Sequence, residues 1–154
     1  MWGYSNVKQI EVFYRKLLKE ILKVDTSAPS CFVYGDTGTM PIVNHIINRM
    51  LSFYAKLCNG KQSKLSYILY KVMRKRHDSD ENFESPWIDM VENCFNELGM
   101  SDFWLNECMG FSNEYIKKAV KLKVQDIYKQ EWHMQVLHKD TCDYYSKVKD
   151  THEF

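Results

Sequence analysis

Helical periodicity of apolar residues constrains this chain more than any other feature of its sequence. Apolar side chains recur at three- and four-residue spacing in five segments, which cover roughly residues 6–24, 41–59, 63–77, 85–98 and 112–136. No segment gives a confident strand, and no repeat of fixed period is present. The pattern therefore predicts an all-α fold, a compact bundle of about five to seven helices.

The 154 residues suit a single helical domain or a fragment of one. The formal net charge of +1 conceals a division of the chain. Residues 1–77 carry 13 Lys/Arg against 4 Asp/Glu, a balance of +9, whereas residues 78–154 carry 8 Lys/Arg against 16 Asp/Glu, a balance of −8. We call these the basic half and the acidic half.

The sequence predicts neither a membrane span nor a signal peptide. It has no run of about 18 apolar residues and no N-terminal charged segment followed by an apolar stretch. Its five cysteines are scattered and never spaced as C-x-x-C, which is typical of reduced thiols: Cys31, Cys58, Cys94, Cys108 and Cys142. We expect an intracellular protein, in the cytoplasm or nucleus, whose cysteines are small core residues.

The first segment, about 6–24, predicts an amphipathic helix with two opposed faces. We expect its apolar side chains to form the core face: Val7, Ile10, Tyr14, Leu17, Leu18, Ile21 and Val24. At ~100° per residue, the basic side chains fall on the opposite arc: Lys8, Arg15, Lys16, Lys19 and Lys23. The helix is thus predicted to present a basic surface.

The next two helices are expected at 41–59 and from Ser63 to the basic "KVMRKRH". Pro41 suits the first turn of the former, with Thr39 as a possible cap, and Asn59-Gly60 ends it. Its expected inward residues are Ile42, Ile46, Ile47, Met50, Phe53, Tyr54 and Leu57. Those of the latter are Leu65, Ile68, Leu69 and Val72.

The acidic half begins with an expected exposed loop at 78–84. Ser85 is the predicted N-cap of the following helix, Pro86 its first residue and Gly99 the residue just beyond its end. Ile88, Val91, Phe95 and Leu98 are expected inward. A short turn with Trp104 follows at 101–107, and then the longest helix, with Ile116, Val120, Ile127 and Trp132 inward.

One irregular Gly/Pro loop is predicted after the first helix, with "CFVY" as a short extended piece. Its Tyr34-Gly35-Asp36-Thr37 is one residue short of a Tyr-x-Asp-Asp polymerase motif, because Thr37 stands where the second metal-holding aspartate is needed. The G-x-x-x-x-G-K-[ST] frame of a phosphate loop is also missing. Gly35, Gly38 and Pro41 therefore favour a turn between helices.

No pattern predicts an enzyme, a cofactor or a bound metal. His133 and His138 are five residues apart, so in a helix they point about 140° apart and do not converge with Cys142 on a zinc ion. No Ser-His-Asp or Cys-His arrangement can be assembled. We predict no catalytic residue in this chain.

Basic side chains are the best functional signal. The basic face of the first helix and a second group, Arg74, Lys75 and Arg76, are suited to neutralising phosphates. Aromatic side chains such as Trp2, Tyr4 and Tyr70 would stack on bases if they are exposed. Two alternatives stay open: an ordinary solvated helix face, or pairing with the stretch 78–107, which has no Lys or Arg.

The residues "IEVFYRKLLKEILKV" and "SAPSCFVYGDTGTMPI" resemble the region just after the polymerase domain in reading frames of non-LTR (LINE-type) retrotransposons of aquatic animals. The family pattern there is an Ile-Glu helix, Leu-x-Val, a Pro-containing turn, Val-Tyr-Gly-Glu-x-Gly, and Pro-Leu or Pro-Ile. Matching positions continue to Trp132: Arg49, Met50, Phe53, Asn59-Gly60-Lys61, Ser63-Lys64-Leu65-Ser66, Ser85-Pro86-Trp87-Ile88, Gly99, Phe103-Trp104, Gln125-Asp126 and Gln130. Asp36 and Thr39 depart from it, since Glu and a basic residue are usual there.

The resemblance implies a fragment that lacks the polymerase and endonuclease of the full-length proteins, or the product of a truncated element copy. Together with the basic side chains, it predicts a non-catalytic helical module that binds template RNA or target DNA through phosphate contacts, with the remainder of the reverse transcriptase protein as a partner. The resemblance itself implies no particular binding residue. The alternative is a structural linker that packs the polymerase thumb against the C-terminal domain. That linker predicts self-association through apolar surface left uncovered by truncation.

Overall fold

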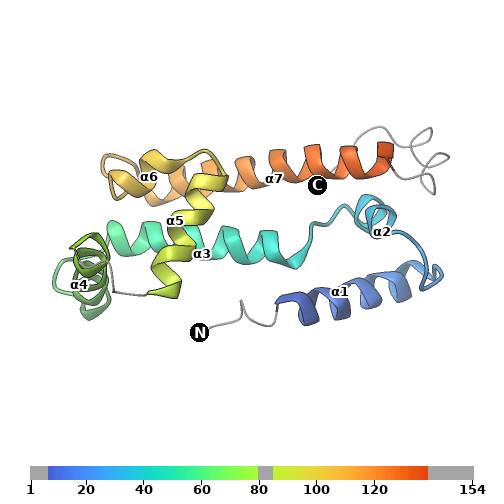
Figure 1. Cartoon of the computed structure of the whole chain (residues 1–154), viewed down its shortest axis with the longest axis horizontal. Coiled ribbons are helices and arrows are strands. Elements are labelled where there is room, and N and C mark those ends of the chain that lie inside the picture. Colours follow the sequence, from blue (N-terminus) through green and yellow to red (C-terminus); the bar gives the residue numbers. More distant parts are fainter. Residues whose placement is uncertain (1–6, 80–84, 139–154) are drawn as a thin grey trace. The chain divides into compact units, whose positions relative to one another are not determined.

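The computed structural model describes residues 7–79 and 85–138 (Figure 1). Within these ranges the chain forms seven α-helices and no strand, which confirms the predicted all-α class and the upper end of the expected helix number. The helices are α1 (Val7–Leu22), α2 (Ser30–Thr37), α3 (Ile42–Cys58), α4 (Leu65–Ser79), α5 (Pro86–Glu97), α6 (Ser101–Leu105) and α7 (Asn113–His138). Trp2, Tyr4 and Cys142 lie outside the described residues. Of the loop predicted at 78–84, residues 80–84 also lie outside them, whereas Asp78 and Ser79 belong to α4 and not to a loop.

The chain divides into two compact units, which we describe separately. The described part of unit 1 is residues 7–46 and 125–138, and that of unit 2 is residues 47–79 and 85–124. Each unit contains residues from both the basic half and the acidic half. The change in charge at residue 77 is therefore not a boundary between the units. The prediction of a single domain stays a prediction.

The expected extended piece "CFVY" is wrong, because these residues belong to α2. Pro29, with φ −58° and ψ 140°, precedes the helix, and Gly38 ends it in the left-handed region at φ 63°, donating its N–H to the Tyr34 carbonyl. Four apolar residues are too few to distinguish a strand from a buried helical turn by periodicity. The predicted irregular loop is therefore two short connections on either side of a helix that packs against α1 (Figure 1).

The core face of α1 is only partly as predicted. Val7 and Leu18 are buried, and Tyr14 and Leu22 pack against the core of unit 1. The other expected core residues are exposed: Ile10, Leu17, Ile21 and Val24. The helix carries two apolar stripes, and only the stripe beside Glu11 meets the rest of unit 1.

The Glu11 carboxylate joins three helices of unit 1. One oxygen accepts a hydrogen bond from the Tyr34 hydroxyl in α2, and the other accepts one from the backbone N–H of Ile42 at 2.7 Å. Ile42 is the first residue of α3, where backbone N–H groups lack partners within the helix and the helix dipole favours an anion. Glu11 thus fixes which face of α1 turns inward.

Trp132 brings α7 into the same core. Its indole Nε1 donates to the Cys31 carbonyl at 2.8 Å, across 101 positions of sequence, and Tyr128 meets the Tyr34 ring edge-on. The buried cluster comprises Leu18, Cys31, Val33, Tyr34, Met40, Tyr128, Trp132 and Val136. Of the residues predicted inward in α7, Ile116, Val120 and Trp132 are buried, whereas Ile127 is partly exposed.

Unit 2 is built around Tyr54, which is fully buried. Its ring lies 5.4–5.6 Å, centroid to centroid, from the rings of Tyr70, Phe95 and Trp104. Within α3, Tyr54 and Leu57 are buried as predicted, but Phe53 is exposed. The remaining predicted core residues of α3 are partly exposed: Ile42, Ile46, Ile47 and Met50.

The elements α5 and α6 match the sequence predictions most closely. Ile88, Val91, Phe95 and Leu98 are buried, and Trp104 is buried in the short helix α6. Pro86 is the first residue of α5 and Ser85 precedes it, although the Ser85 side chain makes no capping bond. Gly99 follows at φ 64°, a value that only glycine adopts without strain.

The predicted core stripe of α4 is wrong. Leu65, Ile68, Leu69 and Val72 are 47–69% exposed, whereas Tyr70 and Arg74 are 2% and 8% exposed. Tyr70 packs against Tyr54, and Arg74 packs against Trp104. The helix therefore turns its polar and aromatic face inward and its aliphatic stripe outward.

The Glu11 contact gives the first testable prediction. Glu11→Ala removes two hydrogen bonds to a charged acceptor, so we expect it to lower the free energy of unfolding by about 1–3 kcal/mol. Urea denaturation followed by circular dichroism measures this loss. Glu20→Ala, an exposed position on the same helix, is the control and is expected to change stability by less than about 0.5 kcal/mol. Equal effects of the two substitutions would contradict the role given to Glu11.

Candidate functional site

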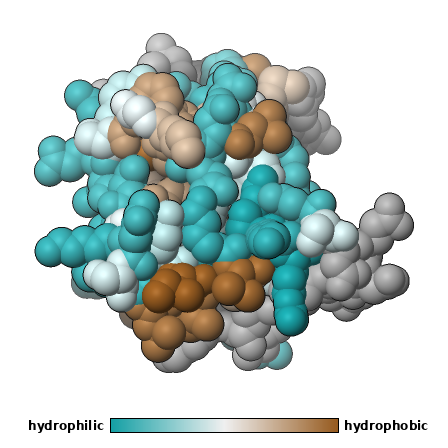
Figure 2. All heavy atoms as spheres, turned by 90° about the vertical axis from the view of Figure 1, so that its left-hand side faces the viewer, coloured by the Kyte–Doolittle hydropathy of each residue, from teal (hydrophilic) through white to brown (hydrophobic). Residues whose placement is uncertain are grey.

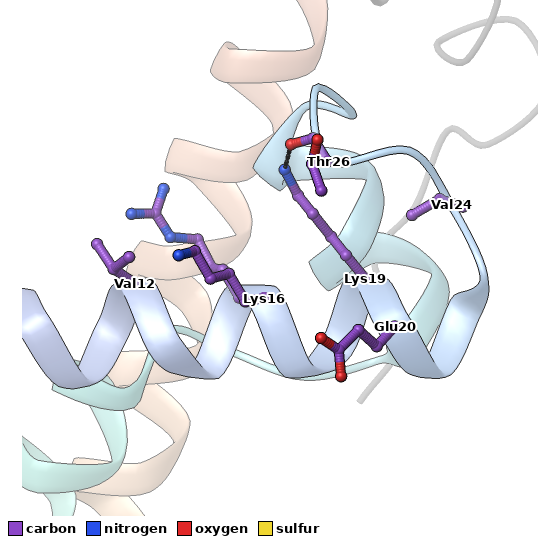
Figure 3. Close-up of a pocket in the computed structure, with 7 residues that line it drawn as sticks. Val12, Lys16, Lys19, Glu20, Val24 and Thr26 are labelled. Atoms are coloured by element: carbon purple, nitrogen blue, oxygen red, sulfur yellow. Dashed lines mark hydrogen bonds between the residues drawn. The ribbon is translucent and has the colours of Figure 1, made fainter.

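A groove of about 450 Å³ lies along α1 and the loop that follows it, within unit 1 (Figure 3). It is lined by Val12, Arg15, Lys16, Lys19, Glu20, Val24 and Thr26. Three of these seven residues belong to the predicted basic face. Part of the predicted basic face therefore lines this groove.

The loop beside the groove is held by its own hydrogen bonds. Lys23 has φ 54°, and the Val24 N–H donates to the Lys19 carbonyl at 3.1 Å, which closes the end of α1. The Ser27 N–H donates to the Asp25 carboxylate at 2.7 Å. The hydrogen bonds from Ser27 lower the pKa of Asp25, so this carboxylate is an anion at neutral pH beside the groove.

Two of the predicted cations that line the groove already have hydrogen-bond partners within unit 1. Lys19 donates to the Thr26 carbonyl, and Figure 3 shows its side chain reaching from α1 to the loop. Arg15 Nη1 donates to Ser30 Oγ at 3.1 Å, which ties α1 to α2. Both side chains therefore help to hold the fold, and their charge faces the groove from fixed positions.

The other three cations of the face are exposed: Lys8, Lys16 and Lys23. Of the two acids of α1, Glu11 is bonded to α2 and α3. Glu20 points away from Lys19 in Figure 3 and lines the groove together with Lys16. The exposed side of α1 and the residue after it thus carry a cationic strip, and Lys16 joins this strip to the groove.

The second predicted group is only partly on the surface, because one of its three cations is buried. The Arg74 guanidinium carbon lies 3.5 Å from the Trp104 ring centroid, and Arg74 Nε donates to Asp78 at 3.0 Å. Arg74 is therefore a core residue of unit 2, which corrects its predicted role. Lys75 and Arg76 are exposed, and Tyr70, which was predicted to stack on bases if exposed, is buried.

Polar contacts explain why α4 buries the face that sequence reasoning placed in solvent. The Tyr70 hydroxyl donates to the Tyr54 hydroxyl at 3.2 Å, and Lys71 forms an ion pair with Glu107. His77 Nε2 lies 3.1 Å from an Asp89 oxygen and 3.5 Å from a Glu92 oxygen. The signal in the sequence was the line of polar and aromatic residues at 67, 70, 74 and 77, which matches a helical face as well as the aliphatic stripe does.

The aliphatic stripe of α4 is consequently a surface feature. Leu65, Ile68, Leu69 and Val72 recur at helical spacing and are all exposed. Figure 2 views the side of Figure 1 on which α4 lies and shows hydrophobic side chains gathered in a patch there. A similar stripe on α1 comprises Ile10, Phe13, Leu17 and Ile21, of which Phe13 is 68% exposed. Sequence reasoning assigned the residues of both stripes to the core, apart from Phe13, for which it made no prediction.

The described residues contain no group of His, Cys, Asp or Glu side chains able to hold a metal ion. His133 is exposed on α7. Within the same residues, no helix combines the length and the apolar character needed to cross a membrane. Comparison with family models, curated proteins and solved structures gave no match.

The position of Arg74 is tested by substitution. Arg74→Ala removes a buried cation from the Trp104 face and its bond to Asp78, so we expect a loss of about 2–3 kcal/mol in the free energy of unfolding. Lys75→Ala, at the adjacent exposed position, is expected to cost less than about 0.5 kcal/mol. Chemical denaturation measures both values. If Arg74→Ala proves as mild as Lys75→Ala, Arg74 is a surface residue and the inward face of α4 is wrongly assigned.

Proposed function

We propose that this chain is a non-catalytic helical module of a retrotransposon reverse transcriptase, which holds template RNA or target DNA through phosphate contacts on α1. The observation that carries the proposal is the cationic strip of exposed Lys8, Lys16 and Lys23, of which Lys16 lines the groove. The resemblance of residues 10–24 and 27–42 to the region after the polymerase supports it. A cytoplasmic or nuclear location, the absence of a cofactor and the lack of catalysis are parts of the same proposal.

The spacing of the strip suits a nucleic-acid backbone. At 1.5 Å per residue, Lys8 and Lys16 lie about 12 Å apart along the axis of α1, a distance over which a duplex presents several phosphates. Both are long, flexible side chains with a single charge at the tip, which contact phosphate without reading bases. We therefore expect binding that depends on salt and little on sequence.

The binding experiment uses fluorescence anisotropy with a structured RNA and a DNA duplex, titrated across salt concentration. We expect log K to fall linearly with log salt, and the triple variant Lys8→Glu/Lys16→Glu/Lys23→Glu to lose at least about tenfold in affinity at low salt with a shallower slope. These three lysines are chosen because Arg15 and Lys19 also hold Ser30 and Thr26. Replacing Arg15 or Lys19 would change the stability of the fold as well as nucleic-acid binding, so the two effects could not be separated.

The matched control is Lys75→Glu/Arg76→Glu, which reverses charge on exposed positions of α4 in unit 2. It is expected to retain most of the affinity. If wild type fails to bind either nucleic acid at low salt, or if the control loses as much affinity as the triple variant, phosphate contact by α1 is refuted.

A second function, a docking module, is favoured by the two exposed aliphatic stripes of α1 and α4. In this proposal the occupant is the remainder of the same reverse transcriptase, with the polymerase thumb on one side and the C-terminal domain on the other. Apolar stripes that stay uncovered are a source of self-association. The charges then serve solubility or domain docking.

Sedimentation velocity over a range of protein concentrations tests the docking function. We expect wild type to self-associate, and Phe13→Ser/Ile21→Ser combined with Leu65→Ser/Leu69→Ser to shift the chain toward monomer without loss of stability, since all four positions are exposed. High salt should strengthen this association, whereas it weakens nucleic-acid binding. A wild-type chain that stays monomeric at high concentration would count against docking through these stripes.

A further inference from the structure

Two cysteines that are 50 positions apart in sequence meet in unit 2. Cys58 is the last residue of α3, and Cys108 lies in the turn between α6 and α7. Asn59, the residue after Cys58, donates its side-chain N–H to the Phe111 carbonyl at 3.1 Å, which holds the end of α3 against this turn. The Cys58 thiol donates to the Tyr70 hydroxyl at 3.5 Å, and the two thiols are close enough for each to shift the pKa of the other. Cys58 therefore lies beside the tyrosine hydroxyl groups in the aromatic core of unit 2.

Cys58 has the access and the surroundings of a reactive thiol. It is partly exposed, unlike Cys31, Cys94 and Cys108, which are buried. Hydrogen bonding from Cys108, together with that from Tyr70 and Tyr54, lowers the pKa of Cys58. Burial raises the pKa of both tyrosines, so these phenols stay protonated and able to donate to a thiolate.

Cys108 has the opposite character. It is fully buried, and its thiol lies 3.5 Å from the Phe103 carbonyl. Its neighbouring Cys58 thiol and its burial raise the pKa of Cys108. The backbone holds it at φ 58°, after Glu107 at φ 46°, and the Cys108 N–H donates to the Phe103 carbonyl at 2.9 Å. Cys108 is thus shielded from solvent oxidants but fixed beside Cys58.

We propose that Cys58 and Cys108 form a peroxide-reactive dithiol, in which Cys58 is oxidised first, to a sulfenic acid, and Cys108 then converts it to a disulfide. The Cys58 thiolate attacks one oxygen of hydrogen peroxide, so that an S–O bond forms, the O–O bond breaks and hydroxide leaves. The Cys108 sulfur then attacks the Cys58 sulfenic acid. An S–S bond forms, the S–O bond breaks, and the oxygen departs as water with the Cys108 proton.

The balance of the two steps is two thiols and one hydrogen peroxide to one disulfide and two waters. The sulfur atoms lose two electrons and the peroxide gains them. The disulfide would join the end of α3 to the turn before α7 and close a loop of about 50 residues, which restricts the unfolded chain. Oxidation is therefore expected to raise the melting temperature of the protein.

Cys94 is the matched control within the same unit. It is buried in α5, and burial raises the pKa of Cys94 to about 11. At neutral pH the thiolate fraction of Cys94 is therefore about a hundredfold smaller than that of a cysteine with the ordinary thiol pKa. A thiolate of higher pKa is intrinsically more nucleophilic, but this compensates for only part of the difference in reaction rate. We expect Cys58 to react with peroxide about tenfold faster than Cys94.

The test treats the full chain with a few equivalents of hydrogen peroxide and maps its cysteines by mass spectrometry without reduction. Digestion with trypsin and a glutamate-specific protease separates Cys94 from Cys108, since Glu97 and Glu107 lie between them. We expect one disulfide-linked pair, Cys58 with Cys108, and a higher melting temperature that reductant reverses. Cys94→Ser is expected to behave as wild type.

Two variants separate the roles of the pair. Cys108→Ser should stop at a Cys58 sulfenic acid that a dimedone probe captures, and Cys58→Ser should give neither the disulfide nor the probe adduct at Cys108. A disulfide that links other cysteines, or a Cys58 that reacts no faster than Cys94 in wild type, would overturn the proposal. Both of these contradicting results are measured on the wild-type protein. The test therefore remains decisive even if a variant folds poorly.

Discussion

The burial of Arg74 against the Trp104 indole decides which way α4 faces, and the exposed aliphatic stripe of α4 follows from it. A guanidinium placed 3.5 Å from an aromatic centroid is stabilised by the ring and by its bond to Asp78. The hydroxyl of Tyr70 and the imidazole of His77 find partners on the same side of the helix. With these groups inward, the aliphatic stripe of α4 can only face outward.

Unit 1 shows the same dependence on a single charged group. The Glu11 carboxylate reaches both α2 and the first N–H of α3, and this contact selects one of the two apolar stripes of α1 for the core. The basic arc is left beside the groove, with Arg15 and Lys19 fixed by Ser30 and Thr26. Two proposed functions therefore share one helix, because α1 has one face in the core, a cationic face that we propose binds phosphate, and an exposed apolar face that we propose binds a partner.

Sequence periodicity predicted α5 and α7 well for a physical reason. Ile88, Val91 and Phe95 form one apolar face with no competing polar one, so hydrophobic burial alone orients the helix. In α4 two faces compete, and the choice depends on Trp104, Asp89 and Glu92, which lie elsewhere in the sequence. Of the predicted basic site, the cationic strip of α1 is on the surface, whereas Arg74 is part of the core.

The sequence by itself determined the all-α class, the positions of most helix ends and the uneven distribution of charge, because these depend on residue type and local spacing. The tertiary structure alone decided that residues 30–37 are helical, that α4 buries Tyr70 and Arg74, and that Cys58 stands beside Cys108. Each of these outcomes depends on contacts between residues far apart in the chain. Local periodicity carries no information about which distant partner will satisfy a buried polar group or thiol.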